Sequence, residues 1–302
     1  MKKEKTKKKK KIINIFCWIC YFVACLIIFG LILESPASKD IIRPLSNESD
    51  YPVYSGKNVY EYWKTTLSED RQLVYDELKE SFLQFKKDFS VHIDGNLSLD
   101  DFKEIYTAVL LDHPEMFWMY SYSVTTRFFS NDINTSKKIK LEYSFSEEES
   151  KDIKKRIKPK YEAIINEAKK LESIYDKIKY VHDELIRLGV YTKYDEDNLV
   201  YFQSLISIFD TGETVCSGYS YGFKFIMDNL GIDCILTRDV SNEDVSKNHI
   251  WNMVKLDGIW YNIDLTYDGN VDDEYIYYKY FLKDNEEFYK NHKMQDKIPQ
   301  NE

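Results

Sequence analysis

The sequence predicts an α+β fold, and three kinds of local pattern support that class. Aromatic and β-branched residues alternate with polar ones over residues 116–129 and 139–145, which is typical of paired β-strands. Apolar residues at helical spacing follow the capping residues Ser68 and Ser98. Farther on, Asp257-Gly258 separates two short apolar runs, and this dipeptide favours a two-residue hairpin turn.

The composition is that of a folded, acidic protein. Of the 302 residues, 43% are hydrophobic and 31% are charged, whereas glycine (10) and proline (6) are too scarce for a low-complexity chain. The net charge is −9 although residues 1–11 contain eight lysines, so the rest of the chain is strongly acidic. An acidic body lacks the basic face that nucleic acid requires, and we expect no nucleic-acid partner.

The lysines of residues 1–11 precede an apolar run over residues 12–33, in which Asn14 is the only strongly polar member. As a helix of about 33 Å, this run can cross a hydrocarbon core of about 30 Å. We therefore expect a cytoplasmic basic segment (1–11), a transmembrane helix (12–33), a stalk (34–55) and an extracytoplasmic body, because lysines stay on the cytoplasmic side. A cleaved signal peptide, or a lipoprotein cleavage box at residues 22–25, is the alternative.

Three of the five cysteines lie in the apolar run, which leaves Cys216 and Cys234 in the body. A helix over residues 217–230 would separate these two by about 20 Å. The Cα atoms of bridged cysteines lie within about 7 Å of each other. We therefore predict that both thiols are free, and a free thiol in an exported protein calls for a reason.

Residues 56–170 are predicted to form an N-terminal α+β region. Its expected elements are a helix over 71–89 capped by Ser68, a helix from Ser98 to 111, the strand pair 116–129 and 139–145, and a long charged helix from Ser146 to about 170. This region contains no recognisable catalytic motif. We interpret it as a support or recognition domain.

Residues 171–302 are predicted to form a second domain. Its expected elements are a helix over 173–188, a short helix over 201–209, a helix over 216–230 ended by Gly231, and strands over 233–240, 249–256 and 259–266. The Asp257-Gly258 turn makes the last two strands antiparallel neighbours. The aromatic tail over 275–292 is expected to pack back on this domain.

Three residues in this domain, Cys216, His249 and Asp264, are of types suited to catalysis. Cys216 begins a helix, where unpaired N–H groups and the macrodipole favour a thiolate, and Gly218 is expected to leave the first turn open to a substrate. Taken singly, each residue also has a plainer interpretation. Cys216 can be a small buried residue, His249 a structural hydrogen-bonding group, and Asp264 an ordinary strand aspartate.

The predicted hairpin brings two of these residues together. With Asp257-Gly258 as the turn, His249 lies opposite Thr266, and Asp264 lies diagonally across on the same face. The Asp264 carboxylate can then orient the imidazole while the other ring nitrogen faces the thiol of Cys216. We therefore predict a constellation of Cys216 as nucleophile, His249 as general base and acid, and Asp264 as the orienting residue.

At these residues the chain resembles the transglutaminase-like superfamily of papain-like cysteine enzymes, and is most similar to bacterial cytokinesis-associated transglutaminase/protease-like proteins. The resemblance covers residues 178–268 and rests on Val-Cys-x-Gly-Tyr, His-x-Trp-Asn and Gly-x-Trp-Tyr-x-x-Asp-x-Thr. It implies a papain-like core and the same roles for Cys216, His249 and Asp264. The chain departs from the pattern at Ile250, where alanine is usual, and at Tyr267, where tryptophan is usual.

These features predict a membrane-anchored, extracytoplasmic cysteine hydrolase or acyltransferase that acts on peptide or amide bonds through a thioester. Water as acceptor makes it a protease or amidase, an amine makes it a cross-linking enzyme, and hydrolysis is favoured. The expected partners are the membrane and a peptide or protein substrate, cell-wall peptides included. The alternatives are a catalytically silent surface module that binds peptides in the same cleft, and a structural anchor for envelope assembly.

Other residues contribute less to the function. No Cys or His pair has the spacing of metal ligands and no glycine-rich phosphate loop is present, so we predict no metal and no cofactor. His182, with Asp183 beside it, either supports the site or is structural, and the structural interpretation is favoured. Trp251 and Trp260 are predicted to be core residues or cleft walls.

Overall fold

The computed structural model describes residues 59–91, 97–127, 136–192, 199–239, 248–269 and 276–301. The predicted basic segment, transmembrane helix and stalk lie outside these residues. Of the helices that are described, none has both the length and the apolar character needed to cross a bilayer. Tyr51–Glu302 forms one compact unit, whose mixture of helices and strands confirms the predicted α+β class.

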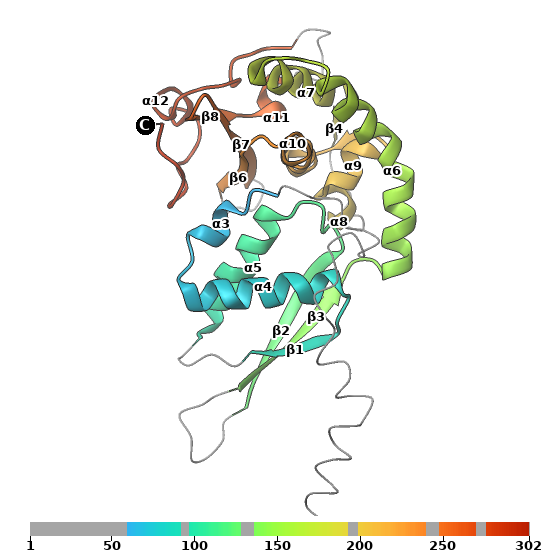
Figure 1. Ribbon diagram of the computed structural model, residues 1–302, viewed down its shortest axis with the longest axis vertical. Coiled ribbons are helices and arrows are strands. Elements are labelled where there is room, and N and C mark those ends of the chain that lie inside the picture. Colours follow the sequence, from blue (N-terminus) through green and yellow to red (C-terminus); the bar gives the residue numbers. More distant parts are fainter. Residues whose placement is uncertain are drawn as a thin grey trace, which may run out of the picture. The chain divides into compact units, whose positions relative to one another are not determined.

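The first part of this unit is a pair of helices packed on a three-stranded sheet (Figure 1). Its elements are α3 (Tyr62–Thr65), α4 (Glu69–Leu83), α5 (Leu99–Asp112), β1 (Asp88–Val91), β2 (Met119–Arg127) and β3 (Ser136–Tyr143). The sheet has the order β1-β3-β2 and is antiparallel throughout. Aromatic rings join the layers, because Phe82 of α4 meets Tyr143 edge-on at 5.5 Å and Phe102 of α5 meets Tyr122 at 4.6 Å.

The prediction of one helix over residues 71–89 was wrong at its C-terminal end. Helix α4 stops at Leu83, and Phe85 has a positive φ of 51°, which turns the chain out of the helix. The Phe85 ring stacks on Trp118 at 5.4 Å and on Tyr143 at 5.2 Å. The apolar spacing at Phe85 therefore reflects packing on the sheet, and the residues after it pair with β3 as β1.

Helix α6 (Glu147–Ala168) begins after Ser146, as predicted, and Ser146 and Glu149 form a capping box at its start. It packs against α7 (Ile174–Leu188), α9 (Leu205–Phe209) and α10 (Cys216–Leu230). Its Tyr161 makes edge contacts with Phe209 and Phe225 at 5.8 and 5.0 Å. One hydrophobic core thus extends through both predicted domains, and their boundary near residue 170 stays a prediction.

The second part of the unit surrounds α10 with helices on one side and an antiparallel sheet on the other (Figure 1). The sheet has the order β6-β7-β8, and the remaining elements are short. The bounds are β4 (Val190–Tyr191), α8 (Leu199–Phe202), β5 (Glu213–Thr214), β6 (Cys234–Asp239), β7 (His249–Leu256), β8 (Ile259–Ile263), α11 (Leu265–Asp268) and α12 (Asn285–Phe288). The predicted helix over 201–209 is two helices, because Ser204 caps α9 with its side chain.

The predicted β7–β8 hairpin and its register are confirmed. Leu256 pairs with Ile259 and Asn252 with Ile263, and both turn residues have positive φ, 51° at Asp257 and 87° at Gly258. Helix α10 is fixed to β7 at Ser220, whose hydroxyl donates to the carbonyl of Ile250 over 3.0 Å. This contact sets the first turns of α10 beside the start of β7.

The predicted strand over 259–266 was too long. Strand β8 ends at Ile263, and Asp264 becomes the N-cap of α11, where its Oδ1 accepts from the backbone N–H of Thr266 at 2.9 Å and of Tyr267 at 3.2 Å. His249 is therefore not paired with Thr266. Aspartate competes for nearby backbone donors, which favours a helix start over a continued ladder.

Candidate active site

Cys216 is the first residue of α10, as the sequence predicted, and its side chain is only partly buried. The N-cap residue Val215 has no polar side chain, so no side-chain cap occupies the first-turn N–H groups of α10. Cys234 is buried on β6, and both thiols are free, which confirms the prediction that they do not pair. Cys216 therefore combines access with an uncapped helix N-terminus.

Gly218 has a different purpose from the one we expected. A Cβ atom there would overlap Thr214 Oγ1 and lie 2.5 Å from Ser207 Oγ. Those two hydroxyls are 2.7 Å apart in the buried contact between β5 and α9. Gly218 is thus required for the close packing of α10 on these elements, and the idea that it opens the first turn to a substrate was wrong.

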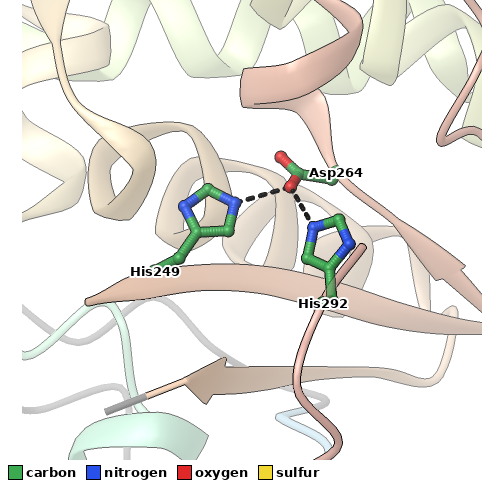
Figure 2. A group of neighbouring side chains, drawn as sticks. All are labelled: His249, Asp264 and His292. Atoms are coloured by element: carbon green, nitrogen blue, oxygen red, sulfur yellow. Dashed lines mark hydrogen bonds and ion pairs between the residues drawn. The ribbon is translucent and has the colours of Figure 1, made fainter. Parts of the chain in front are cut away.

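His249 lies at the start of β7 with its side chain 13% exposed, and its Nε2 is 2.6 Å from Asp264 Oδ2 (Figure 2). Burial opposes the charged ring. Hydrogen bonds and opposite charges from Asp264 and Cys216 outweigh that effect and raise the pKa of His249 to about 10. Because Nε2 meets Asp264, Nδ1 is the nitrogen left to meet the thiol. The three predicted residues therefore converge, although their catalytic roles stay a prediction.

Asp264 is fully buried and accepts four hydrogen bonds. Its Oδ1 faces the two amides of α11, and its Oδ2 faces His249 and a second imidazole, His292, whose Nε2 is 2.9 Å away (Figure 2). Burial favours the neutral acid. The hydrogen bonds from both imidazoles prevail and lower the pKa of Asp264. The group is therefore an anion that fixes the His249 ring.

His292 is a residue of the site that no sequence motif indicated. The histidine lies in the aromatic tail, which packs back on the domain as predicted, with Phe281 and Phe288 buried. The only local signal was an imidazole within an aromatic run. Nothing in that pattern indicates which carboxylate, 28 residues away, the ring would meet.

Aromatic side chains surround His249. Tyr267, at a position where the resemblance leads one to expect tryptophan, stacks on the His249 ring at 4.6 Å with an interplanar angle of 12°. Trp251 is fully buried and packs against Phe288 and His292 of the tail, so it is a core residue. Trp260 is also buried. Tyr267, 49% exposed, therefore covers the imidazole from the solvent side.

His249, Asp264 and His292 are also the group of ligand-type side chains in the described part of the chain that most resembles a metal site. Their closest N···O distances are 2.6 and 2.9 Å. Ligands about 2.0–2.1 Å from a tetrahedral zinc ion lie roughly 3.3 Å apart. The group is packed as hydrogen-bonded partners, and the carboxylate would have to move before an ion could enter.

A further imidazole, that of His182, connects α11 to α7. His182 of α7 is fully buried, with Nδ1 2.9 Å from Asp183 Oδ1 and Nε2 3.3 Å from Asp268 Oδ2. Asp268 is the last residue of α11, the helix that Asp264 caps. His182 thus ties α11 to α7, which agrees with the structural interpretation.

A cavity of about 210 Å³ lies between the two parts of the unit. Tyr106 and Leu110 of α5, the chain from His113 to Tyr120, Gln203, Ser204 and Tyr221 of α10 contribute to its walls. Burial raises the pKa of Tyr221, and the charge of Arg238 opposes this effect while that of Cys216 adds to it. Tyr221 and Cys216 lie in the first two turns of the same helix, α10.

No family model matches this chain, and no curated protein matches it. Among solved structures it is similar to a TGase, with 15% identity, a TM-score of 0.34, and coverage of 70% of this chain and 54% of that chain. It is also similar to the periplasmic domain of TgpA from Pseudomonas aeruginosa, with 13% identity, a TM-score of 0.28, and coverage of 48% and 62%. The same domain bound to ethylmercury gives 14%, 0.27, 48% and 65%. The chain spans about half the length of the TGase.

Proposed function

We propose that this protein is a membrane-anchored, extracytoplasmic cysteine hydrolase or acyltransferase that acts on peptide or amide bonds. One observation carries the proposal. A partly exposed thiol at an uncapped helix N-terminus interacts with an imidazole that a buried carboxylate holds in place. These are the groups that thiol acyl transfer requires, namely a nucleophile, a proton carrier and an orienting group.

The proposed reaction runs through a thioester. The Cys216 thiolate attacks the carbonyl carbon, and the first-turn N–H groups of α10 face the developing oxyanion. His249, charged because its pKa is about 10, donates its proton to the leaving amine as the C–N bond breaks. The now neutral imidazole takes a proton from water or an acceptor amine, which attacks the thioester and releases Cys216.

The cavity lined by Tyr221 is an argument that the substrate is a peptide. Its walls are mostly aromatic and aliphatic, with the Tyr221 ring on α10 and the Tyr106 ring on α5. A space of about 210 Å³ suits a single side chain of a substrate better than a large ligand. In this proposal the N-terminal region is a recognition element, because α5 and the chain after it form one wall.

The substrate and its location are also proposals. The apolar run over residues 12–33 and the lysines before it would anchor the protein with its body outside the cytoplasm. An enzyme in that position can reach surface proteins and cell-wall peptides. Hydrolysis is favoured over transfer, and mass spectrometry of the acyl product formed in the presence of a primary amine distinguishes the two, because water gives a free carboxylate and the amine gives a new amide.

The test is the rate at which iodoacetamide alkylates Cys216 in the full-length protein, measured from pH 5 to 10 by peptide mass spectrometry. We expect a fast rate that persists below pH 7 in the wild type and is lost in His249→Ala. Buried Cys234 is an internal control, because its side chain has no exposed surface. The matched variant His113→Leu removes another buried imidazole, whose ring nitrogens face Glu115 and Glu61, and should keep the fast phase.

Two outcomes separate the candidate functions. A rate that rises only near the ordinary thiol pKa of about 8.5 and does not change in His249→Ala would exclude an activated thiol. The protein would then be a surface module that binds peptides in the same cleft. A fast, His249-dependent rate supports the enzyme and justifies a search among peptides and glutamine-type amides.

A further inference from the structure

His292 contacts Asp264 although it is not one of the three predicted residues Cys216, His249 and Asp264. Its Nε2 lies 2.9 Å from Asp264 Oδ2, the same oxygen that His249 Nε2 meets at 2.6 Å. Figure 2 shows the two imidazoles approaching this one oxygen from different sides, His249 from β7 and His292 from the tail. The buried carboxylate is therefore shared between two rings.

The surroundings of His292 make it a hydrogen-bond donor to Asp264. Its side chain is 2% exposed and stacks on Phe288 at 3.9 Å, with the edge of Trp251 at 5.0 Å. Its Nδ1 finds no hydrogen-bond partner among the described residues. Because Nε2 faces a carboxylate oxygen, Nε2 carries the ring proton. The aromatic packing holds this N–H in a single direction.

The tail is fixed on both sides of His292. Before it, the amide of Asn262 on β8 donates to Asn285 Oδ1 over 2.8 Å. After it, Gln295 Oε1 accepts from the backbone N–H of Arg238 on β6 over 2.9 Å. These contacts fix the position of His292 relative to β6 and β8, the two strands that flank β7. His249 lies on β7.

We infer that His292 is a positioning residue that holds the Asp264 carboxylate toward His249, so that the C-terminal tail is an integral part of the site. The amides of α11 restrain only Oδ1. Oδ2 is restrained by the two imidazoles. Without His292, the His249 ring would be the only described side chain that restrains Oδ2, although Asp264 is proposed to orient that same ring. The consequence for catalysis rests on the proposed function, whereas the hydrogen-bond network does not.

The experiment compares two substitutions in the full-length protein. His292→Gln places an N–H donor near the position of Nε2, and His292→Leu removes the donor while keeping an apolar side chain in the aromatic pocket. We expect Cys216 alkylation at pH 6 to fall roughly 10- to 100-fold in His292→Leu, because a displacement of about 1 Å costs about that much. His292→Gln should restore most of the rate.

A control separates positioning from docking of the tail. Ile298→Ala removes a buried side chain farther along the tail and leaves the contacts of His292, Asn285 and Gln295 in place. It should lower the melting temperature as much as His292→Leu or more, and leave alkylation within about threefold of wild type. Equal losses of rate in Ile298→Ala and His292→Leu, or no rescue by His292→Gln, would overturn the inference.

A spectroscopic measurement keeps the inference testable if the thiol proves unreactive. With ¹⁵N-labelled histidine, wild-type His249 and His292 should both show Nε2-bound protons shifted downfield by the carboxylate. The His249 signal should broaden or move in His292→Leu and recover in His292→Gln. A His292 that carries its proton on Nδ1, or a His249 signal that ignores both substitutions, would refute the positioning role. A slow Cys216 with an intact coupling would refute only the proposed enzyme.

Discussion

Two imidazoles in this protein, His113 and His249, have similar electrostatic settings in different regions. His113 follows α5 and is fully buried, with Nδ1 2.8 Å from Glu115 Oε1 and Nε2 3.2 Å from Glu61 Oε1. Burial opposes its charge, but the two carboxylates raise its pKa to about 9. His249 has a pKa raised to about 10 for the same kind of reason.

The difference lies in the second ring nitrogen. Both nitrogens of His113 face carboxylates, so its charge is neutralised inside the fold and it joins α5 to Glu61. One nitrogen of His249 faces a carboxylate, and the other is left for a partly exposed thiol. A raised pKa therefore identifies a charge partner and not a function. Access and a neighbouring thiol make the difference.

The largest expected effect comes from Asp264→Asn. The amide keeps the shape of the side chain but loses the negative charge that favours the imidazolium and fixes its tautomer. We expect Cys216 alkylation at pH 6 to fall by about 10³-fold or more, as in other triads. Glu115→Gln is the matched change beside His113 and should leave alkylation unaltered. A comparable loss in both variants would mean that general destabilisation, and not orientation of His249, controls the thiol.

Substitution of His113 should affect stability instead of reactivity. His113→Leu leaves Glu115 and Glu61 without their buried cation, and breaking such a pair costs about 3–5 kcal/mol. Denaturant unfolding measures this loss, and the Cys216 alkylation rate of the folded fraction should match that of the wild type. An alkylation rate that falls together with stability would remove the contrast between the two sites.

The pH dependence of stability follows from the same two pKa values. Both are raised above the unfolded value of about 6.5, so both imidazoles stabilise the fold fully below that pH. Their contributions are lost as the pH rises through about 9 for His113 and about 10 for His249. The free energy of unfolding should therefore decrease from pH 7 to pH 10, and less steeply in His113→Leu. Equal slopes in the two proteins would show that His113 is not charged in the fold.

The smallest expected effect concerns Tyr267. Tyr267→Trp keeps a ring stacked on His249 and restores the residue that the resemblance leads one to expect. We expect alkylation of Cys216 to change by less than about threefold, because an aromatic pair contributes about 0.5–1.5 kcal/mol. Tyr267→Ala removes the ring and should change the rate more. If the tryptophan variant is the slower of the two, the Tyr267 hydroxyl has a role that stacking does not explain.

Local signals in the sequence correctly predicted much of the fold. Ser98 and Ser146 cap their helices through capping boxes, and Asp257-Gly258 forms the turn that sets the hairpin register. The end of α4 and the strand β1 were missed. Phe85 continues the helical spacing of apolar residues, but its packing on Trp118 and on Tyr143, which is distant in sequence, competes with that local preference.

By itself, the sequence determined the approximate arrangement of Cys216, His249 and Asp264, whose catalytic roles stay a prediction. A two-residue turn specifies the register between β7 and β8, and the start of an apolar helical period places Cys216 at the first turn of α10. Only the tertiary structure decided that Asp264 caps α11 and that His292 shares its carboxylate. Such contacts depend on how distant segments pack, because a side chain's partner across many residues leaves no periodic trace in the chain.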